Sequence, residues 1–165
     1  MNSPNEFRIA RATEQDVPLL LKLITALADY ERLGSEVVAT ETRLRQSLFG
    51  PRPDAEVILA YAGREPAGFA VWFYTYSTFL GRAGLYLEDL FVLPEWRGRG
   101  LGRQLLAYLA RVAVARGCGR MEWAVLDWNE LAISFYKKVG ARAMDDWTVY
   151  RLTGEALKNL ASEVG

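Results

Sequence analysis

The chain has 165 residues, 51% of them hydrophobic and 24% charged, and its 20 basic and 20 acidic residues leave no net charge. This length fits one domain with a continuous core, and the balanced charge disfavours nucleic-acid binding, which normally needs a basic excess. The chain has no histidine, which excludes Ser-His-Asp triads and histidine metal ligands, so we expect no metal and acid–base chemistry by Asp, Glu, Tyr, Lys or Cys.

The cysteine content and the apolar segments bear on location. Cys118 is the single cysteine, so no intramolecular disulfide can form and a reducing compartment is expected. The apolar stretch 17–28 is interrupted by Lys22 and is too short to span a bilayer. Residues 1–7 lack the basic start and apolar run of a signal peptide. We therefore expect a cytoplasmic protein with no membrane partner.

The N-terminal third is predicted to hold a strand and two helices. Residues 7–11 alternate in polarity as a short strand does. Thr13 and Asp16 have the spacing of a capping box, and the leucines after them have the spacing of a helix that ends near residues 33–34. A second helix is predicted over 40–48.

The middle of the chain is predicted to be mostly strands. Residues 56–62 and 67–76 form a hairpin around a turn at 63–66. A third strand covers 85–93, and a long helix runs over 102–116 and ends at Gly117.

The C-terminal part is predicted to continue the strand–helix alternation. A buried strand covers 121–126, and a helix over 129–139 begins at Asn129 as N-cap and ends at Gly140. Residues 147–152 read as a strand before a short terminal helix. Hairpins combined with strand–helix–strand crossovers predict one α/β domain over 1–165, a mixed sheet flanked by helices.

A glycine-rich loop lies between the third strand and the long helix, with the sequence Arg97-Gly98-Arg99-Gly100-Leu101-Gly102. Glycines let backbone N–H groups approach an anion, and the helix that follows adds the positive end of its dipole. Arg103-Gln104 replaces the Lys-Ser/Thr of a Walker loop, and the glycine spacing is not that of a dinucleotide fingerprint. A structural turn would explain the glycines alone, whereas the two arginines favour a pyrophosphate ligand.

The loop resembles the R/Q-x-x-G-x-G/A acyl-CoA signature of the GNAT acetyltransferases. Further segments resemble the diamine acetyltransferase branch of that family, closest to the thialysine Nε-acetyltransferase type. These segments are LADYE at 27–31, YLEDLFV at 86–92, AVLDWNE at 124–130, FYK at 135–137 and Gly140-Ala141. The resemblance implies a GNAT fold, a homodimer, and acetyl-CoA as co-substrate for acetylation of a small-molecule amine.

The resemblance also implies roles for individual residues. Tyr136 faces the sulfur of acetyl-CoA as general acid, and Glu88 accepts the proton of the amine. The residues implied in binding acetyl-CoA are Leu90, Phe91, Val92, Arg97, Gly98, Arg99, Gly100, Leu101, Gly102, Asn129 and Tyr136. Those implied in binding the amine are Tyr30, Glu31, Ser77, Glu88 and Asp89.

Some of these residues also have simpler interpretations. Tyr136 could be one aromatic of a packed helix face, and Asn129 has a role as N-cap. Glu88 and Asp89 are adjacent on a strand, so alternation sends their side chains to opposite faces. They could also be a solvated pair, although two acids within an apolar strand are unfavourable without a partner.

The residues leave the identity of the amine open. Ser77-Thr78 places hydroxyl groups where a polyamine enzyme of this branch would carry an acid, so thialysine or a lysine-like amine is favoured over spermidine or putrescine. Protein or peptide acetylation and a CoA-binding sensor without turnover are the remaining alternatives. A sensor needs only the loop, so the presence of Glu88 and Tyr136 argues against it.

Overall fold

The computed structural model describes residues 6–164. Residues 1–5 of the segment inspected above for a signal peptide lie outside this range. The chain divides into two compact units, one through Leu126 and one from Asp127, and each is described in turn. Within the described residues, no helix is both long and apolar enough to cross a membrane.

The first unit is built on one five-stranded sheet with its strands in sequence order. The first four strands pair antiparallel, and the last pair is parallel. The predicted α/β class with a mixed sheet is therefore confirmed. The strands are β1 (Phe7–Arg11), β2 (Glu56–Ala62), β3 (Glu65–Ser77), β4 (Arg82–Val92) and β5 (Met121–Trp123).

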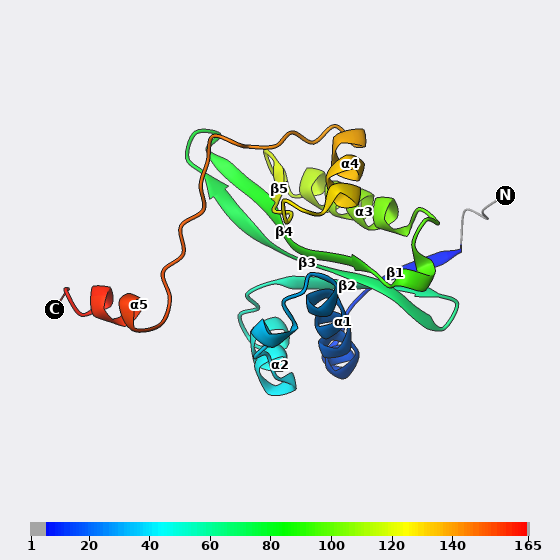
Figure 1. The fold of residues 1–165 in the computed structure, drawn as a ribbon, viewed down its shortest axis with the longest axis horizontal. Coiled ribbons are helices and arrows are strands. Elements are labelled where there is room, and N and C mark those ends of the chain that lie inside the picture. Colours follow the sequence, from blue (N-terminus) through cyan, green and yellow to red (C-terminus); the bar gives the residue numbers. More distant parts are fainter. Residues whose placement is uncertain (1–5, 165) are drawn as a thin grey trace. The chain divides into compact units, whose positions relative to one another are not determined.

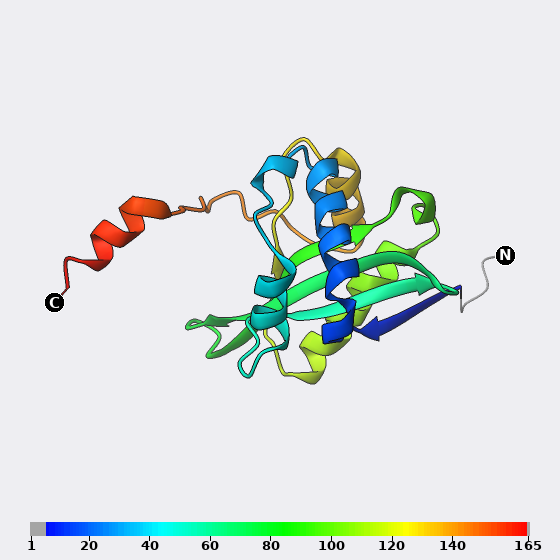
Figure 2. The same ribbon diagram turned by 90° about the horizontal axis from the view of Figure 1, so that it is seen from below.

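Helices cover both faces of this sheet (Figure 1). Helix α3 (Leu101–Ala115) is the crossover between the parallel strands β4 and β5. Helices α1 (Val17–Tyr30) and α2 (Glu41–Phe49) lie on the opposite face, where α1 runs across the strands (Figure 2). Short 3-10 turns are η1 (Glu14–Asp16), η2 (Gly34–Glu36) and η3 (Pro94–Trp96).

The apolar pattern of α1 determines what it packs against. Leu20, Leu23 and Leu27 follow helical spacing, and all three are buried in one cluster with side chains of the central strands. The strand residues of this cluster are Val57, Leu59, Phe69, Val71 and Phe91. The α1 face of the sheet is therefore marked by Phe69 and Val71 of β3, and by Phe91 of β4.

The predicted helix starts agree with the capping interactions. The Thr13 N–H and hydroxyl both contact the Asp16 carboxylate, at 2.7 and 3.0 Å, which completes the predicted capping box at η1, directly before α1. The Thr40 hydroxyl accepts a hydrogen bond from the Arg43 N–H at 3.2 Å. The hairpin turn is shorter than predicted, because β3 already begins at Glu65.

The second unit holds α4 (Glu130–Lys138) and α5 (Gly154–Ala161). The predicted strand over 147–152 is wrong: this segment forms no strand, and Val149 and Tyr150 are 87% and 93% exposed. Alternation indicates only a preference, which a strand realises by pairing with a neighbour. The strand predicted over 121–126 is also shorter, ends at Trp123 and is half-buried rather than buried.

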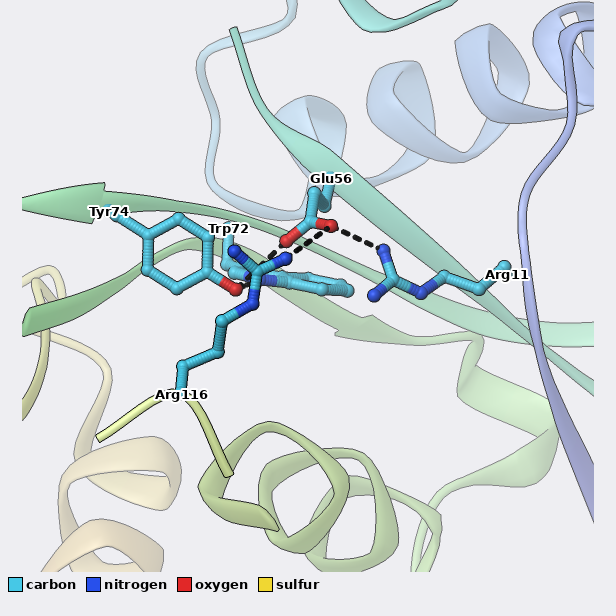
Figure 3. Close-up of polar contacts among 5 residues, drawn as sticks. All are labelled: Arg11, Glu56, Trp72, Tyr74 and Arg116. Carbon is cyan, nitrogen blue, oxygen red and sulfur yellow. Dashed lines mark hydrogen bonds and ion pairs between the residues drawn. The ribbon is translucent and has the colours of Figure 1, made fainter. Parts of the chain in front are cut away.

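One polar network ties three strands to the end of α3 (Figure 3). The Glu56 carboxylate, 25% exposed, accepts hydrogen bonds from Arg11 at 2.7 Å and from the Tyr74 hydroxyl at 3.0 Å. Arg116 pairs with the same carboxylate at 3.7 Å. Burial alone would raise the pKa of Glu56, but the bonds from Arg11 and Tyr74 and the charges of Arg11 and Arg116 outweigh it and lower the pKa.

We predict that Glu56→Gln lowers the free energy of unfolding by about 1–2 kcal/mol at pH 7, because charge-assisted bonds are lost in a partly buried site. Urea unfolding measures the difference. Since the folded-state pKa is lowered, the stabilisation is complete above the ordinary value of 4.5 and disappears as the pH falls through the folded-state pKa.

Glu14→Gln is the matched control, because the Glu14–Arg45 ion pair joins two side chains that are 61% and 41% exposed. It should cost less than about 0.5 kcal/mol. Equal effects of the two substitutions would show that the Glu56 network adds nothing beyond an exposed pair.

Candidate active site

The pairing of β4 with β3 contains an extra residue at Glu88. Leu87 pairs with Trp72 and Asp89 pairs with the adjacent Val71, so Glu88 has no partner on β3. This is a β-bulge, which reverses the alternation of side chains along the strand. Before it, Leu87 shares a face with Trp72; after it, Asp89 shares the α1 face with Val71.

The bulge corrects the expectation that Glu88 and Asp89 point to opposite faces. Phe73 lies two residues after Val71 on β3, so its side chain is on the α1 face. Tyr86 pairs with Phe73, and their ring centres are 5.1 Å apart. Glu88 lies two residues after Tyr86 and is therefore on the same face. The charge of Glu88 accordingly acts on the pKa of both Tyr86 and Asp89. The inserted residue thus gathers both carboxylates on one side of the sheet.

Beyond the bulge, no strand among residues 6–164 pairs with the second edge of β4, which we call the open edge. Strand β5 pairs only with Leu85, Tyr86 and Leu87. The Leu93 N–H donates to the Ala67 carbonyl of β3 at 2.9 Å, so alternation turns the backbone groups of Phe91 toward β3 and those of Leu90 and Val92 toward the open edge. Of the three residues predicted to bind acetyl-CoA on this strand, Leu90 and the N–H of Val92 can therefore bind an extended ligand there, whereas the Val92 carbonyl accepts from Arg97.

The glycine loop lies between this open edge and the N-terminus of α3. Gly98 and Gly100 have φ of 75° and 84°, which glycine adopts without strain. Gly100 is the N-cap of α3, whose first amides have no partner within the helix. A Cβ on Gly102 would meet only Val92 Cγ2, at 3.9 Å. The loop therefore offers free backbone donors and space for an anion at the helix N-terminus.

The two arginines of the loop contact the protein itself. The Arg97 Nε donates to the Val92 carbonyl at 2.9 Å, and its guanidinium carbon lies 4.5 Å from the centre of the Tyr30 ring. Arg99 pairs with Glu6 at 3.0 Å and lies 5.0 Å from the Trp96 ring centre. Both side chains thus anchor the loop, a role that the sequence did not suggest.

Acidic and aromatic side chains meet where α1 ends beside β4. Burial, with smaller contributions from the charges of Glu88 and Glu31, raises the pKa of Asp89 to about 6. Burial also raises the pKa of Glu31. The Tyr30 ring lies 6.2 Å from that of Phe91. Four of the five predicted amine-binding residues, Tyr30, Glu31, Glu88 and Asp89, therefore gather on the α1 face of the sheet.

Ser77, the fifth residue, lies elsewhere. It is 6% exposed and ends β3, where its hydroxyl accepts from the Leu80 N–H at 3.2 Å and its carbonyl accepts from the Gly81 N–H at 2.8 Å. Six residues separate it from Val71, the partner of Asp89, which is about 20 Å along a strand. Within the first unit, Ser77 closes the β3–β4 turn.

The second unit carries Asn129 and Tyr136. The Asn129 side chain accepts a hydrogen bond from the Ala132 N–H at 3.3 Å, so the predicted N-cap of α4 is confirmed. The Tyr136 ring lies 5.5 Å from that of Phe135, and the Tyr136 carbonyl accepts the Ala141 N–H at 3.1 Å. Gly140, at φ 90°, ends the helix as predicted.

Within residues 6–164, no three His, Cys, Asp or Glu side chains group in a way that could hold a metal ion.

The bulge is the feature of the site that sequence analysis missed. Its signal was present as two adjacent acids, Glu88 and Asp89, inside an otherwise apolar strand.

Known proteins are similar to this chain both in sequence and in fold. The model of the Acetyltransferase (GNAT) family matches residues 23–141. Thialysine N-epsilon-acetyltransferase from Sus scrofa is 38% identical over 94% of this chain and 97% of its own. L-ornithine N5-acetyltransferase NATA1 from Arabidopsis thaliana is 34% identical, over 92% and 86%.

Among solved structures, an integron cassette protein from the mobile metagenome of V. cholerae superposes with a TM-score of 0.79. It is 29% identical, and the match covers 94% of this chain and 98% of that one. The open edge of β4 and the loop at the N-terminus of α3 fit the family that these similarities indicate. The chain belongs to the GNAT family of acetyltransferases and is an N-acetyltransferase.

Proposed function

We propose that the protein transfers the acetyl group of acetyl-CoA to the side-chain amine of a small amino acid, thialysine or a lysine-like compound. The observation that carries this proposal is the group of three carboxylates, Glu31, Glu88 and Asp89, on the α1 face of the sheet. The glycine loop follows directly after the same strand, β4. Two relatives named above act, by their names, on thialysine and on ornithine N5. Both substrates are amino acids with a terminal amine.

The chemistry requires the site to remove a proton. A primary alkylamine has a pKa of about 10.4, so forming the free amine at pH 7 costs roughly 4.6 kcal/mol. A general base is most effective when its pKa lies near the working pH. The sequence predicted Glu88 as this base; the raised pKa of its neighbour, about 6, favours Asp89 instead. Glu88 and Glu31 then add the negative charge that attracts an ammonium group.

Acetyl-CoA supplies the activated acetyl group. The backbone of residues 98–102 and the N-terminus of α3 would hold its pyrophosphate, and the open edge of Leu90 and Val92 would bind its extended arm and polarise the thioester. Asn129 would contact the same arm, and the Tyr136 hydroxyl would donate a proton to the departing sulfur. The amine attacks directly, and its proton passes to Asp89.

A polyamine substrate is the second candidate. The charges of Glu31 and Glu88 both act on the pKa of Asp89, so the three carboxylates lie near one another. Such a group also suits a ligand with several positive charges. No acid stands in the Ser77–Gly81 turn, where a polyamine enzyme of this branch would have one. A sensor without turnover is not supported, because the chain belongs with N-acetyltransferases.

We also propose that residues 1–165 act as one acetyltransferase domain, because the family match runs across both compact units. A cytoplasmic location remains part of the proposal, supported by the single cysteine.

We further propose a homodimer. Trp147, Val149 and Tyr150 are 76%, 87% and 93% exposed, and a monomer rarely leaves several large apolar side chains so close together in water. Light scattering should give a mass of two 18.6 kDa chains. A mass of one chain at micromolar concentration would contradict this assembly.

The substrate is tested by thiol release from acetyl-CoA with thialysine, lysine, ornithine, putrescine, spermidine and a lysine peptide. We expect thialysine to exceed spermidine in kcat/KM by about tenfold or more, because the substrates in the names of the two relatives are amino acids. If spermidine is preferred, the polyamine candidate replaces this one. Absence of turnover with every amine would refute the proposed function.

The proton acceptor is tested by Asp89→Asn. In the wild type, kcat/KM for the amine should rise through pH 6, because Asp89 must be ionised and its pKa is about 6. In the variant, kcat/KM should no longer rise through pH 6, and its value at pH 7 should fall roughly 100-fold. A persisting rise in Asp89→Asn, or its loss in Glu88→Gln instead, would return the role to Glu88.

Two controls accompany this test. The pKa of Asp89 is raised from 3.8 to about 6 in the folded state, so stability falls as the pH rises between these values and the full cost of ionisation is present above pH 6. Asp89→Asn should therefore be at least as stable as the wild type at pH 7 by thermal unfolding, which separates lost chemistry from misfolding. Tyr136→Phe should lower kcat about tenfold or more and keep the rise through pH 6.

A further inference from the structure

The Arg97 side chain joins three parts of the first unit. Its Nε donates to the carbonyl of Val92, the last residue of β4, at 2.9 Å. Its guanidinium carbon lies 4.5 Å from the ring centre of Tyr30, the last residue of α1, and 5.3 Å from that of Phe91. Its backbone enters the glycine loop directly. One side chain thus contacts the end of a helix, the end of a strand and the start of the loop.

These contacts direct the guanidinium toward the α1 face. Phe91 belongs to the core cluster beneath α1. The neighbouring Val92 side chain lies on the opposite face of β4, where its Cγ2 is 3.9 Å from the position that a Cβ on Gly102 of α3 would take. The loop backbone and the N-terminus of α3 therefore lie on one side of β4, and the Arg97 guanidinium stacks on the other. In this arrangement the Arg97 side chain contacts the end of β4 and the end of α1, and its predicted part in binding the phosphates stays a prediction.

The aromatic rings under Arg97 adjoin the carboxylates. Glu31 directly follows Tyr30, and Asp89 stands two residues before Phe91 on the same face of β4. The Tyr30 and Phe91 rings are 6.2 Å apart. A shift of the guanidinium would therefore change the spacing between the end of α1 and β4, and with it the distance between Glu31 and Asp89.

The glycine loop, in turn, depends on its ends. Among the described residues, no atom lies within 4 Å of the position that a Cβ would take on Gly98 or Gly100, so the loop is held mainly by its arginines, Arg97 at its start and Arg99 through Glu6 and Trp96. A ligand that orders the loop backbone will also fix the residue at its start, which is Arg97.

We propose that Arg97 is a positioning residue that couples the two substrate sites: acetyl-CoA bound on the loop holds Arg97 on Tyr30 and Phe91, and this sets the spacing of Glu31 and Asp89 for the amine. The coupling rests on the proposed function, because it requires the amine to bind at these carboxylates. It is reciprocal, so the amine must strengthen CoA binding by the same factor.

The test is calorimetric titration of CoA into the full-length protein with and without saturating thialysine. CoA carries no acetyl group, so binding is measured without turnover. We expect thialysine to tighten CoA binding by about fivefold or more in the wild type. Arg97→Lys keeps the positive charge but loses the planar stacking and the Nε bond, and should reduce that factor to about one, whatever its affinity for CoA alone.

Tyr30 supplies a matched pair of variants. Tyr30→Leu removes the ring and should abolish the coupling, whereas Tyr30→Phe keeps the ring face and should retain it. Full coupling in both Arg97→Lys and Tyr30→Leu would overturn the proposal. So would an Arg97→Lys variant whose only defect is weaker binding of CoA alone, because that result describes a phosphate ligand.

Failure of the proposed function has a different signature. A wild type that binds CoA but neither binds nor acetylates any amine refutes the function itself. A wild type that acetylates thialysine with no coupling to CoA binding refutes only the role of Arg97. Circular dichroism spectra and thermal unfolding of all three variants establish that the folded state is retained.

Discussion

The proposed amine site depends on one extra residue in strand β4. An antiparallel pair without a bulge would send Glu88 and Asp89 to opposite faces, and only one could serve a given ligand. With Glu88 unpaired, both carboxylates reach the α1 face, where the charge of Glu31 adds to them. Burial, with smaller contributions from the charges of Glu88 and Glu31, raises the pKa of Asp89 to about 6. The ionised carboxylate therefore opposes folding at neutral pH, and its pKa suits the proposed role of proton acceptor.

The same strand separates the two halves of the chemistry. Its backbone is open to an extended ligand past Leu87, where β5 no longer pairs with it, and the loop after it ends at the positive pole of α3. Its other face presents the carboxylates beside the end of α1. An enzyme that transfers a group between two substrates needs them to approach from two directions, and β4 provides both.

The sequence predicted the order of elements well because each has a local signal. The capping box at Thr13 and Asp16 and the glycine ends of α3 and α4 act over a few residues. The bulge escaped prediction because it depends on pairing between β3 and β4. Residues 147–152 alternate as a strand should, yet form none, because no edge pairs with them. The role of Arg97 could not be predicted, since Tyr30 is distant in sequence.

We propose that the amine binds at the carboxylates on the α1 face and the pyrophosphate at the N-terminus of α3. A crystal structure with CoA and thialysine tests this most directly. We expect the amine nitrogen within hydrogen-bond distance of Asp89 or Glu31, the pyrophosphate on the backbone of residues 98–102, and Arg97 still stacked on Tyr30. An amine held away from both carboxylates, or a pyrophosphate bound by the Arg97 guanidinium, would contradict it.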